Sequence, residues 1–315
     1  MARTRPTGRP GAGSRWRTLG WLLPTALVAL VVVVLLARWL RTVPAVADFL
    51  LAYPGETDLP EAAPVGFPAW LAWQHFLNAF FLVFIIRSGL LVRSTQRPKG
   101  HWQRRNTGRL RTAGKPARIS LNLWLHLAVD ILWTLNGLVF MVLIFITGQW
   151  LRIVPISWEV FPHAASVAIQ YLSLDWPAHA SWVSYNALQL LAYFVTTFVA
   201  APLALLSGLR MSPGWPKGQS GVAGAVNRVL PVTAARAMHF PIMIYFVAFT
   251  VMHVTLVLST GAQANLNHMF AARNDDSWLG LIFFAGAVVL MVGAWVVAKP
   301  AFTQPVAALT GKVTR

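Results

Sequence analysis

Long apolar runs separated by polar segments dominate this chain. A helix that crosses a bilayer needs about 20 mostly apolar residues, because its backbone polar groups must be satisfied within the helix. The pattern therefore predicts an all-α fold, a polytopic membrane helix bundle with six transmembrane helices. They are expected at residues 21–40, 67–92, 121–147, 183–208, 238–259 and 278–298.

Two segments allow more than one interpretation. Residues 21–40 follow a basic stretch, as in a signal peptide, but the apolar run is longer than usual and no small-residue cleavage site follows it. We therefore expect a retained anchor. In segment 157–174, an acidic residue, a proline and a histidine leave too short a clean run to span a membrane. A helix lying in the membrane interface is expected there, anchored by Trp158, Phe161 and Tyr171.

The composition is that of a membrane protein. Of the 315 residues 57% are hydrophobic and 11% are charged, where soluble domains carry about 25% charged residues. The mean hydropathy is +0.58. These values exclude a soluble enzyme, a disordered tail and a DNA-binding module, despite the net charge of +17. The absence of cysteine excludes disulfides, thiolate zinc sites, iron–sulfur clusters and thioether-linked haem.

The basic residues are unevenly distributed along the chain. Of the 26 Lys and Arg residues, 21 lie in four segments that carry no acidic residue: 1–20, 93–119, 209–236 and 299–315. Because Lys and Arg concentrate in cytoplasmic loops, we expect a multi-pass protein of the bacterial plasma membrane with both termini in the cytoplasm. The basic loop 93–119 then marks topology and contacts headgroups of the lipid bilayer, and no nucleic acid partner is expected.

Histidines supply the candidate chemistry. Ionisable side chains in membrane helices are costly and usually functional. Four histidines fall inside predicted spans: His75, His126, His239 and His253. The other four are expected in loops, with solvated or capping roles: His101, His163, His179 and His268.

The spacing of the membrane histidines indicates two separate sites. His239 and His253 are fourteen residues apart on one predicted helix, about 21 Å along its axis and on nearly the same face. The direction in which each helix is expected to cross the membrane gives the depth of its histidines. On this basis His75 pairs with His253 near the outer surface, and His126 pairs with His239 near the inner surface. Two imidazoles can saturate a haem iron, which leaves no open position for substrate and suits electron transfer.

Four further residues are candidates at these sites. Gly89 and Gly137 fall at the depths of the inner and the outer pair, where a missing side chain gives a flat macrocycle room, although glycine is also simply frequent in membrane helices. Arg87 and Asp130 are charges deep in the predicted spans. They predict either a mutual salt bridge, or Arg87 on a haem propionate with Asp130 in a proton path. Arg87 can also snorkel to the inner surface.

Three stretches of the chain resemble the bacterial cytochrome b561/nickel-hydrogenase cytochrome b family: WLAWQHFLNAFFLVFIIRSGLLV, SLNLWLHLAVDILWTLNGLVFMVLIFITG and ARAMHFPIMIYFVAFTVMHVTLVLSTG. This family includes membrane subunits of formate dehydrogenases, hydrogenases and thiosulfate reductases. It carries one histidine on each of its first two core helices and two, fourteen apart, on the fourth. The resemblance implies two haem b cofactors, quinone as electron partner, and a partner oxidoreductase subunit that is extracytoplasmic or membrane-associated and similar to molybdopterin-dependent enzymes.

The resemblance covers residues 67–261, the expected four-helix di-haem core. Residues 1–66 add a cytoplasmic N-terminus, an extra transmembrane helix and an outer loop. Residues 262–315 add an outer loop, a sixth transmembrane helix without evident chemistry and a cytoplasmic tail. The extra first helix reverses the core relative to the formate dehydrogenase membrane subunit, so the docking side of the partner does not carry over from that family.

Four functions are compatible with these features. The first is transmembrane electron transfer through two haems, between quinone and a partner oxidoreductase, with no catalytic residue in this chain. The second is a ferric reductase-like haem protein, although such proteins take both ligand pairs from two helices, and no flavin or nicotinamide domain is expected after residue 298. The third is a transporter, which the sequence supports only through a kink expected at Pro202. The fourth is a haem-free assembly or anchoring protein.

Overall fold

The computed structural model describes residues 12–107, 111–112, 114–176, 181–216, 218 and 220–314, with side chains described from residue 20 onward. The basic N-terminal residues 1–11 and His179, for which the sequence analysis makes predictions, lie outside the described residues. Within the described part, six helices are long and apolar enough to cross a membrane, so the all-α polytopic fold is confirmed. These candidate spans are Gly20–Leu40, Ala69–Ser94, Leu121–Ile146, Ala187–Met211, Val232–Ser259 and Leu279–Val297.

The chain divides into two compact units. The first contains the described residues within Met1–Asp58, Ile156–His179 and Asn186–Gln189. The second contains those within Leu59–Pro155, Ala180–Tyr185 and Leu190–Arg315, and it includes all four membrane histidines.

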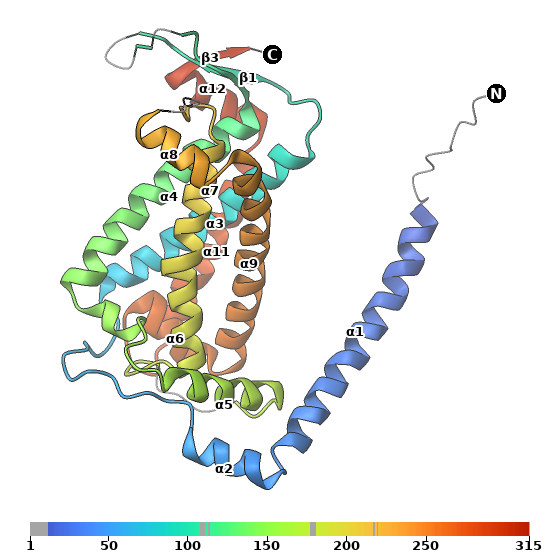
Figure 1. The fold of residues 1–315 in the computed structure, drawn as a ribbon, viewed down its shortest axis with the longest axis vertical. Coiled ribbons are helices and arrows are strands. Elements are labelled where there is room, and N and C mark those ends of the chain that lie inside the picture. Colours follow the sequence, from blue (N-terminus) through green and yellow to red (C-terminus); the bar gives the residue numbers. More distant parts are fainter. Residues whose placement is uncertain are drawn as a thin grey trace. The chain divides into compact units, whose positions relative to one another are not determined.

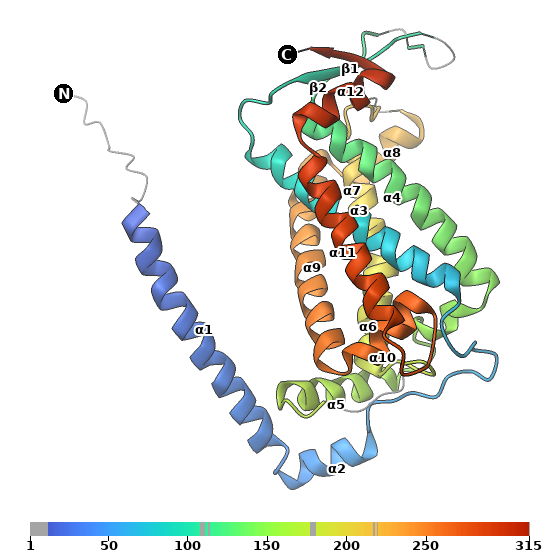
Figure 2. The same ribbon diagram turned by 180° about the vertical axis from the view of Figure 1, so that it is seen from behind.

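The second unit is a bundle of long helices. They are α3 (Ala69–Ser94), α4 (Leu121–Ile146), the greater part of α6 (Ala187–Phe194) followed by α7 (Ala201–Met211), α9 (Val232–Ser259) and α11 (Leu279–Val297). α3 packs along α4, and α7 packs along α9. Figure 1 shows α6 and α7 in front, whereas Figure 2, seen from behind, shows α11 in front. These helices therefore lie on opposite sides of the bundle.

The fourth span is not a regular α-helix. A π-helical segment, η3 (Val195–Ala200), separates α6 from α7, and Pro202 follows in the first turn of α7. Proline has no N–H to donate and its ring clashes with the carbonyl group four residues earlier, so the helix widens just before it. At the position where a kink was expected, the structure has this π-helical segment directly before Pro202.

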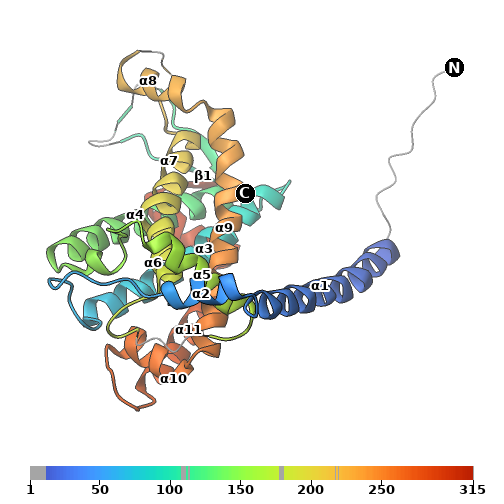
Figure 3. The ribbon, with the colours of Figure 1, turned by 60° about the horizontal axis from the view of Figure 1, so that its bottom comes forward.

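Short elements connect the long helices of this unit. They are η2 (Gln149–Arg152), α8 (Gly221–Val229), α10 (Ala262–Leu266), the π-helical η4 (Asn267–Ala271) and α12 (Pro300–Thr310). α8 and α10 lie at opposite ends of the bundle (Figures 2 and 3). The polar loops that precede and follow the spans are therefore partly helical.

A small antiparallel sheet was not predicted. Among the described residues its strand order is β2 (Arg118–Ser120), β1 (His101–Arg104), β3 (Gly311–Thr314). The central Trp102 pairs with Ile119 on one side and Val313 on the other, and its Nε1 donates to the carbonyl oxygen of Ala307 at 3.1 Å. The sheet joins the basic loop 93–119 to the C-terminal segment, so both lie at one end of the bundle. The four spans between β2 and β3 return the chain to that end.

The first unit contains α1 (Ala12–Leu40), α2 (Pro44–Ala52) and α5 (Val160–Leu172). α2 occupies part of the expected outer loop. With 13 residues α5 is too short to cross a membrane, which agrees with the prediction for segment 157–174. Trp158 and Phe161 are 84% and 51% exposed. Tyr171 differs from the expected anchor: its hydroxyl accepts a hydrogen bond from the side chain of Asn186 at 2.7 Å, and burial raises its pKa.

Candidate functional site: two histidine pairs

Four histidines on three helices come together as two pairs. α3 and α9 bring the ring centroids of His75 and His253 to 6.2 Å. α4 and α9 bring those of His126 and His239 to 6.3 Å. α9 runs over 28 residues without a break, although it contains Pro241, so its two histidines lie about 21 Å apart along the axis. This is the pairing expected from the sequence, and the binding of an iron by either pair stays a prediction.

Two buried serines hold the rings of His126 and His239, which we name the serine-held pair. Ser88 Oγ on α3 lies 3.0 Å from Nδ1 of His126. Ser207 Oγ on α7 lies 2.9 Å from Nδ1 of His239. Each hydroxyl donates its proton to the carbonyl oxygen four residues earlier in its own helix, at 2.7 Å. With its proton on that carbonyl oxygen, each serine oxygen is free to accept a hydrogen bond from Nδ1–H, the tautomer that carries the ring lone pair on Nε2.

A glycine follows each of these serines and makes room for the imidazole. A Cβ atom on Gly89 would lie 3.2 Å from Cε1 of His126, and one on Gly208 would lie 3.4 Å from Cε1 of His239. A larger side chain would therefore displace the ring. Gly89 lies at the expected pair, His126 and His239. It was expected to make room for a macrocycle, whereas its neighbour in this structure is the imidazole of His126. Gly208 and the serines were not predicted, although the tripeptide Ser-Gly-Leu occurs in both apolar helices.

The two charged candidates in the spans lie apart from each other. Oδ2 of Asp130 is 3.6 Å from Nε2 of His126, one turn earlier on α4. Nη2 of Arg87 donates to the carbonyl oxygen of Ala298 at 2.8 Å, and its guanidinium lies 4.8 Å from the ring centre of Trp295. The mutual salt bridge is therefore not formed, because free carbonyl groups at the end of α11 attract the cation instead. The propionate and proton-path roles stay predictions.

Aromatic rings surround His75 and His253, which we name the aromatic-lined pair. The ring of Phe249 stacks on His253 with a centroid distance of 5.5 Å and an interplanar angle of 7°, and Tyr193 on α6 meets it edge-on at 5.9 Å. Phe270 of η4 meets His75 edge-on at 5.4 Å. Nδ1 of His75 is buried and finds no hydrogen-bond partner among the described residues. This pair is therefore held by ring packing.

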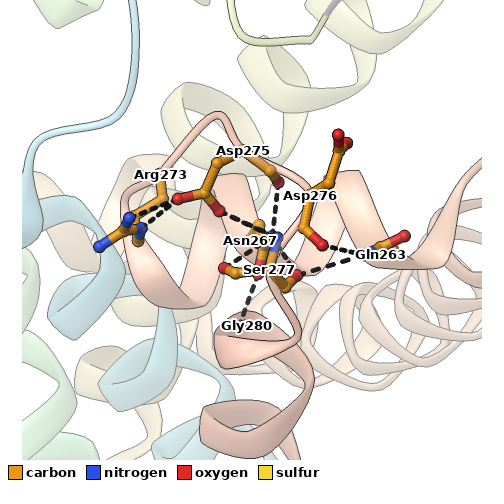
Figure 4. Close-up of polar contacts among 7 residues, drawn as sticks. All are labelled: Gln263, Asn267, Arg273, Asp275, Asp276, Ser277 and Gly280. Carbon is orange, nitrogen blue, oxygen red and sulfur yellow. Dashed lines mark hydrogen bonds and ion pairs between the residues drawn. The ribbon is translucent and has the colours of Figure 1, made fainter.

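The turn η4, which carries Phe270, is fastened to α11 by the fully buried side chain of Asn267 (Figure 4). Nδ2 of Asn267 donates to two carbonyl oxygens of the loop that precedes α11, at 2.8 and 2.5 Å. Its Oδ1 accepts from the backbone N–H of Gly280 at 2.7 Å. A Cβ atom on Gly280 would collide with the backbone at the start of η4, so only glycine permits this approach. The position of Phe270 beside His75 thus depends on these polar contacts.

A buried polar cluster lies next to η4. His268 was expected in a loop, but its side chain is buried, with Nδ1 2.9 Å from Ser181 Oγ and Nε2 2.8 Å from Asn274 Oδ1. Arg152 is 1% exposed, donates to the carbonyl oxygens of Gly66 and Ser181, and has a pKa lowered by burial. The solvated role expected for His268 is wrong, because the π-helical turn directs its ring into this cluster. These contacts fasten loops to one another.

Three other predicted positions fall outside these contacts. A Cβ atom on Gly137 would meet no atom within 4 Å, so the space expected there is present, and its assignment to a macrocycle stays a prediction. His163 was expected in a loop but lies on α5, where Nδ1 accepts from the backbone N–H of Gly55 at 3.1 Å and so connects the loop after α2 to α5. His101 lies on β1 and not in a loop.

No group of three or more His, Cys, Asp or Glu side chains within the described part of the chain is placed to hold a metal ion. A bis-imidazole haem takes only two ligands from the protein. No protein-family model, curated protein or solved structure matches the chain. The resemblance to the cytochrome b family therefore rests on the sequence stretches given above.

Proposed function

We propose that this chain binds two b-type haems and carries electrons across a membrane. The observation that carries the proposal is the separation of the ring centroids, 6.2 Å in one histidine pair and 6.3 Å in the other. A bond from a metal to an imidazole nitrogen is about 2 Å long, so two imidazoles on opposite faces of one iron place their ring centres roughly 6 Å apart. Both distances support one iron between each pair.

The chemistry of the donors also fits a haem at each pair. In the serine-held pair, a proton on Nδ1 would leave the lone pair of Nε2 for a metal, and Oδ2 of Asp130 lies 3.6 Å from that atom of His126. In the aromatic-lined pair, Nδ1 of His75 is buried without a partner. A metal bound through Nε2 would therefore be held by a ring that has no hydrogen-bond partner at Nδ1 among the described residues. When bound, a bis-imidazole haem supplies reversible one-electron transfer.

The residues of the chain itself would orient and shield these groups. The serines would hold the proton at Nδ1 of His126 and His239. The two glycines that follow them make room beside the rings, and apolar helix surfaces would exclude water. The two sites lie about 21 Å apart along α9, in a hydrocarbon core roughly 30 Å thick, so an electron would cross the membrane in shorter transfers between them. Together they would connect the two sides of the membrane.

The proposed partners are quinone on one side and an oxidoreductase subunit on the other. This subunit would be extracytoplasmic or membrane-associated and molybdopterin-dependent, and the chain would act as its electron-transfer subunit in a bacterial plasma membrane. The histidine pattern shared with the cytochrome b561/nickel-hydrogenase cytochrome b family supports this assignment. The chain would then perform no catalysis alone.

The test is a reduced-minus-oxidised absorption spectrum of the purified full-length chain, with haem quantified as the pyridine haemochrome. Two low-spin b-type haems per chain are expected. Protein that is folded, expressed with adequate haem supply and free of haem would overturn the proposal. The haem-free transporter or anchoring functions would then lead.

A further inference from the structure

The two histidine pairs differ in what contacts their ring nitrogens. In the serine-held pair, both Nδ1 atoms lie within 3.0 Å of a serine hydroxyl. In the aromatic-lined pair, Nδ1 of His75 has no partner among the described residues, and aromatic rings from three elements surround the two imidazoles. The same ligand type therefore has two different environments in one bundle.

Each serine of the serine-held pair has a hydroxyl group placed to select one tautomer of the imidazole that it contacts. The side chains of Ser88 and Ser207 are fully buried, so water does not compete for their hydroxyl groups. A hydroxyl has one proton, and each serine directs it to a backbone carbonyl oxygen in its own helix. With the proton there, the oxygen presents only lone pairs to the ring, which favours the neutral imidazole with its proton on Nδ1.

This contact changes the electronic character of the ring. An acceptor on Nδ1–H raises the basicity of the opposite nitrogen and its donation to a bound metal, which stabilises the oxidised form. An environment of aromatic rings, in which Nδ1 of His75 has no acceptor among the described residues, favours the less charged, reduced form. The first effect lowers the midpoint potential of the serine-held pair, and the second raises that of the aromatic-lined pair. Both effects therefore increase the difference between the two potentials.

We propose that Ser88 and Ser207 are positioning residues that fix the Nδ1–H tautomer of His126 and His239 and make the serine-held pair the lower-potential of the two haem sites. The proposal rests on the proposed function, since it concerns two bound haems. Oδ2 of Asp130 lies 3.6 Å from Nε2 of His126, so a carboxylate also acts on this pair, at the nitrogen that would bind the iron. Variants of the serines keep Asp130 in place, so a shift that they cause reports the hydroxyl groups.

The first measurement concerns the rings themselves. Nitrogen NMR of the full-length protein, labelled with ¹⁵N at histidine, should show His126 and His239 as Nδ1–H tautomers, assigned by the loss of each signal in its own His→Ala variant. Ser88→Ala should change the signal of His126, and Ser207→Ala should change that of His239. Signals that give His126 and His239 as Nε2–H tautomers, or that no serine variant changes, would overturn the proposal.

The second measurement is a redox titration of the same protein after its haem content has been determined. Ser88→Ala and Ser207→Ala should each raise the lower midpoint potential and leave the higher one unchanged. Ser88→Thr, which keeps the hydroxyl group, should restore the original value. Ser94→Ala on α3 and Thr250→Val on α9 are matched controls, because their hydroxyl groups bond only to the backbone of their own helix. Neither control should shift a potential.

The outcomes separate this inference from the proposed function. Folded protein without haem overturns the proposed function and this inference with it. Two bound haems whose lower potential does not respond to either serine variant, or whose higher potential responds, overturn the inference and leave the proposed function standing. Two independent serine variants on different helices keep the test decisive if one of them fails to fold.

Discussion

Around His126 and His239, each ring meets one serine and one glycine from the facing helix, and the carboxylate of Asp130 borders His126. Around His75 and His253 the neighbours are large aromatic rings, and one of them comes from the turn η4. Histidines of the same helix, α9, thus enter two different environments fourteen residues apart. Helical spacing sets where a metal could be held, whereas the facing elements set the properties of each site.

The two environments also differ in how they are built. The serine-held pair needs only neighbouring helices, because a Ser-Gly step on α3 contacts α4 and a second one on α7 contacts α9. The aromatic-lined pair needs η4, which is held by the buried side chain of Asn267. We therefore expect perturbations of the loop before α11 to reach one pair and not the other.

The largest effect is expected from removing one ligand of either pair. His253→Ala should delete the site of the aromatic-lined pair, and His239→Ala that of the serine-held pair, so each variant should fall from two haems per chain to one. Haem quantification and the redox titration measure the haem that remains. His101→Ala on β1 is the control and should keep two haems. Loss of both haems from folded protein in both variants would contradict independent sites.

A second test compares two glycines. Gly89→Val should reduce haem binding at the serine-held pair, because even a Cβ atom would lie 3.2 Å from the ring of His126. Gly137→Ala should have little effect, since a Cβ atom there meets nothing within 4 Å. Gly137→Leu should lower binding at the aromatic-lined pair alone if this space belongs to a macrocycle. Full haem content in Gly137→Leu would contradict the role predicted for Gly137.

The six spans and the positions of the histidines could be predicted because they depend on local quantities. The length of an apolar run determines a span, and 14 residues at about 1.5 Å each determine the separation on α9. The contact between Ser88 and His126 could not be predicted in this way, because it depends on which helices are neighbours. The sheet was missed for the same reason, since His101 pairs with Thr314 across most of the chain.

A smaller effect is expected at the support of η4. Asn267→Ala leaves the backbone N–H of Gly280 without its acceptor, a loss of about 1–3 kcal/mol for a buried group. The variant should unfold at lower temperature and change the spectrum or potential of the aromatic-lined pair only. Asn227→Ala is the control, since Asn227 lies on α8 and its side chain contacts Trp215, Pro216 and Gly218, at the end of the bundle opposite α10 (Figure 2). A change confined to the serine-held pair would contradict the assignment of η4 to the other site.

The smallest effect is expected from the exposed carboxylate in the same loop. Hydrogen bonds from Ser277 and Arg273 lower the pKa of Asp275. A lowered pKa stabilises the folded state at neutral pH, and this contribution is lost as the pH falls through the lowered value. The difference in unfolding temperature between the wild type and Asp275→Asn should therefore be largest near pH 7 and shrink below about pH 4. A difference that grows on acidification would mean that the charge does not support the loop, and the position of Phe270 would then depend on Asn267 alone.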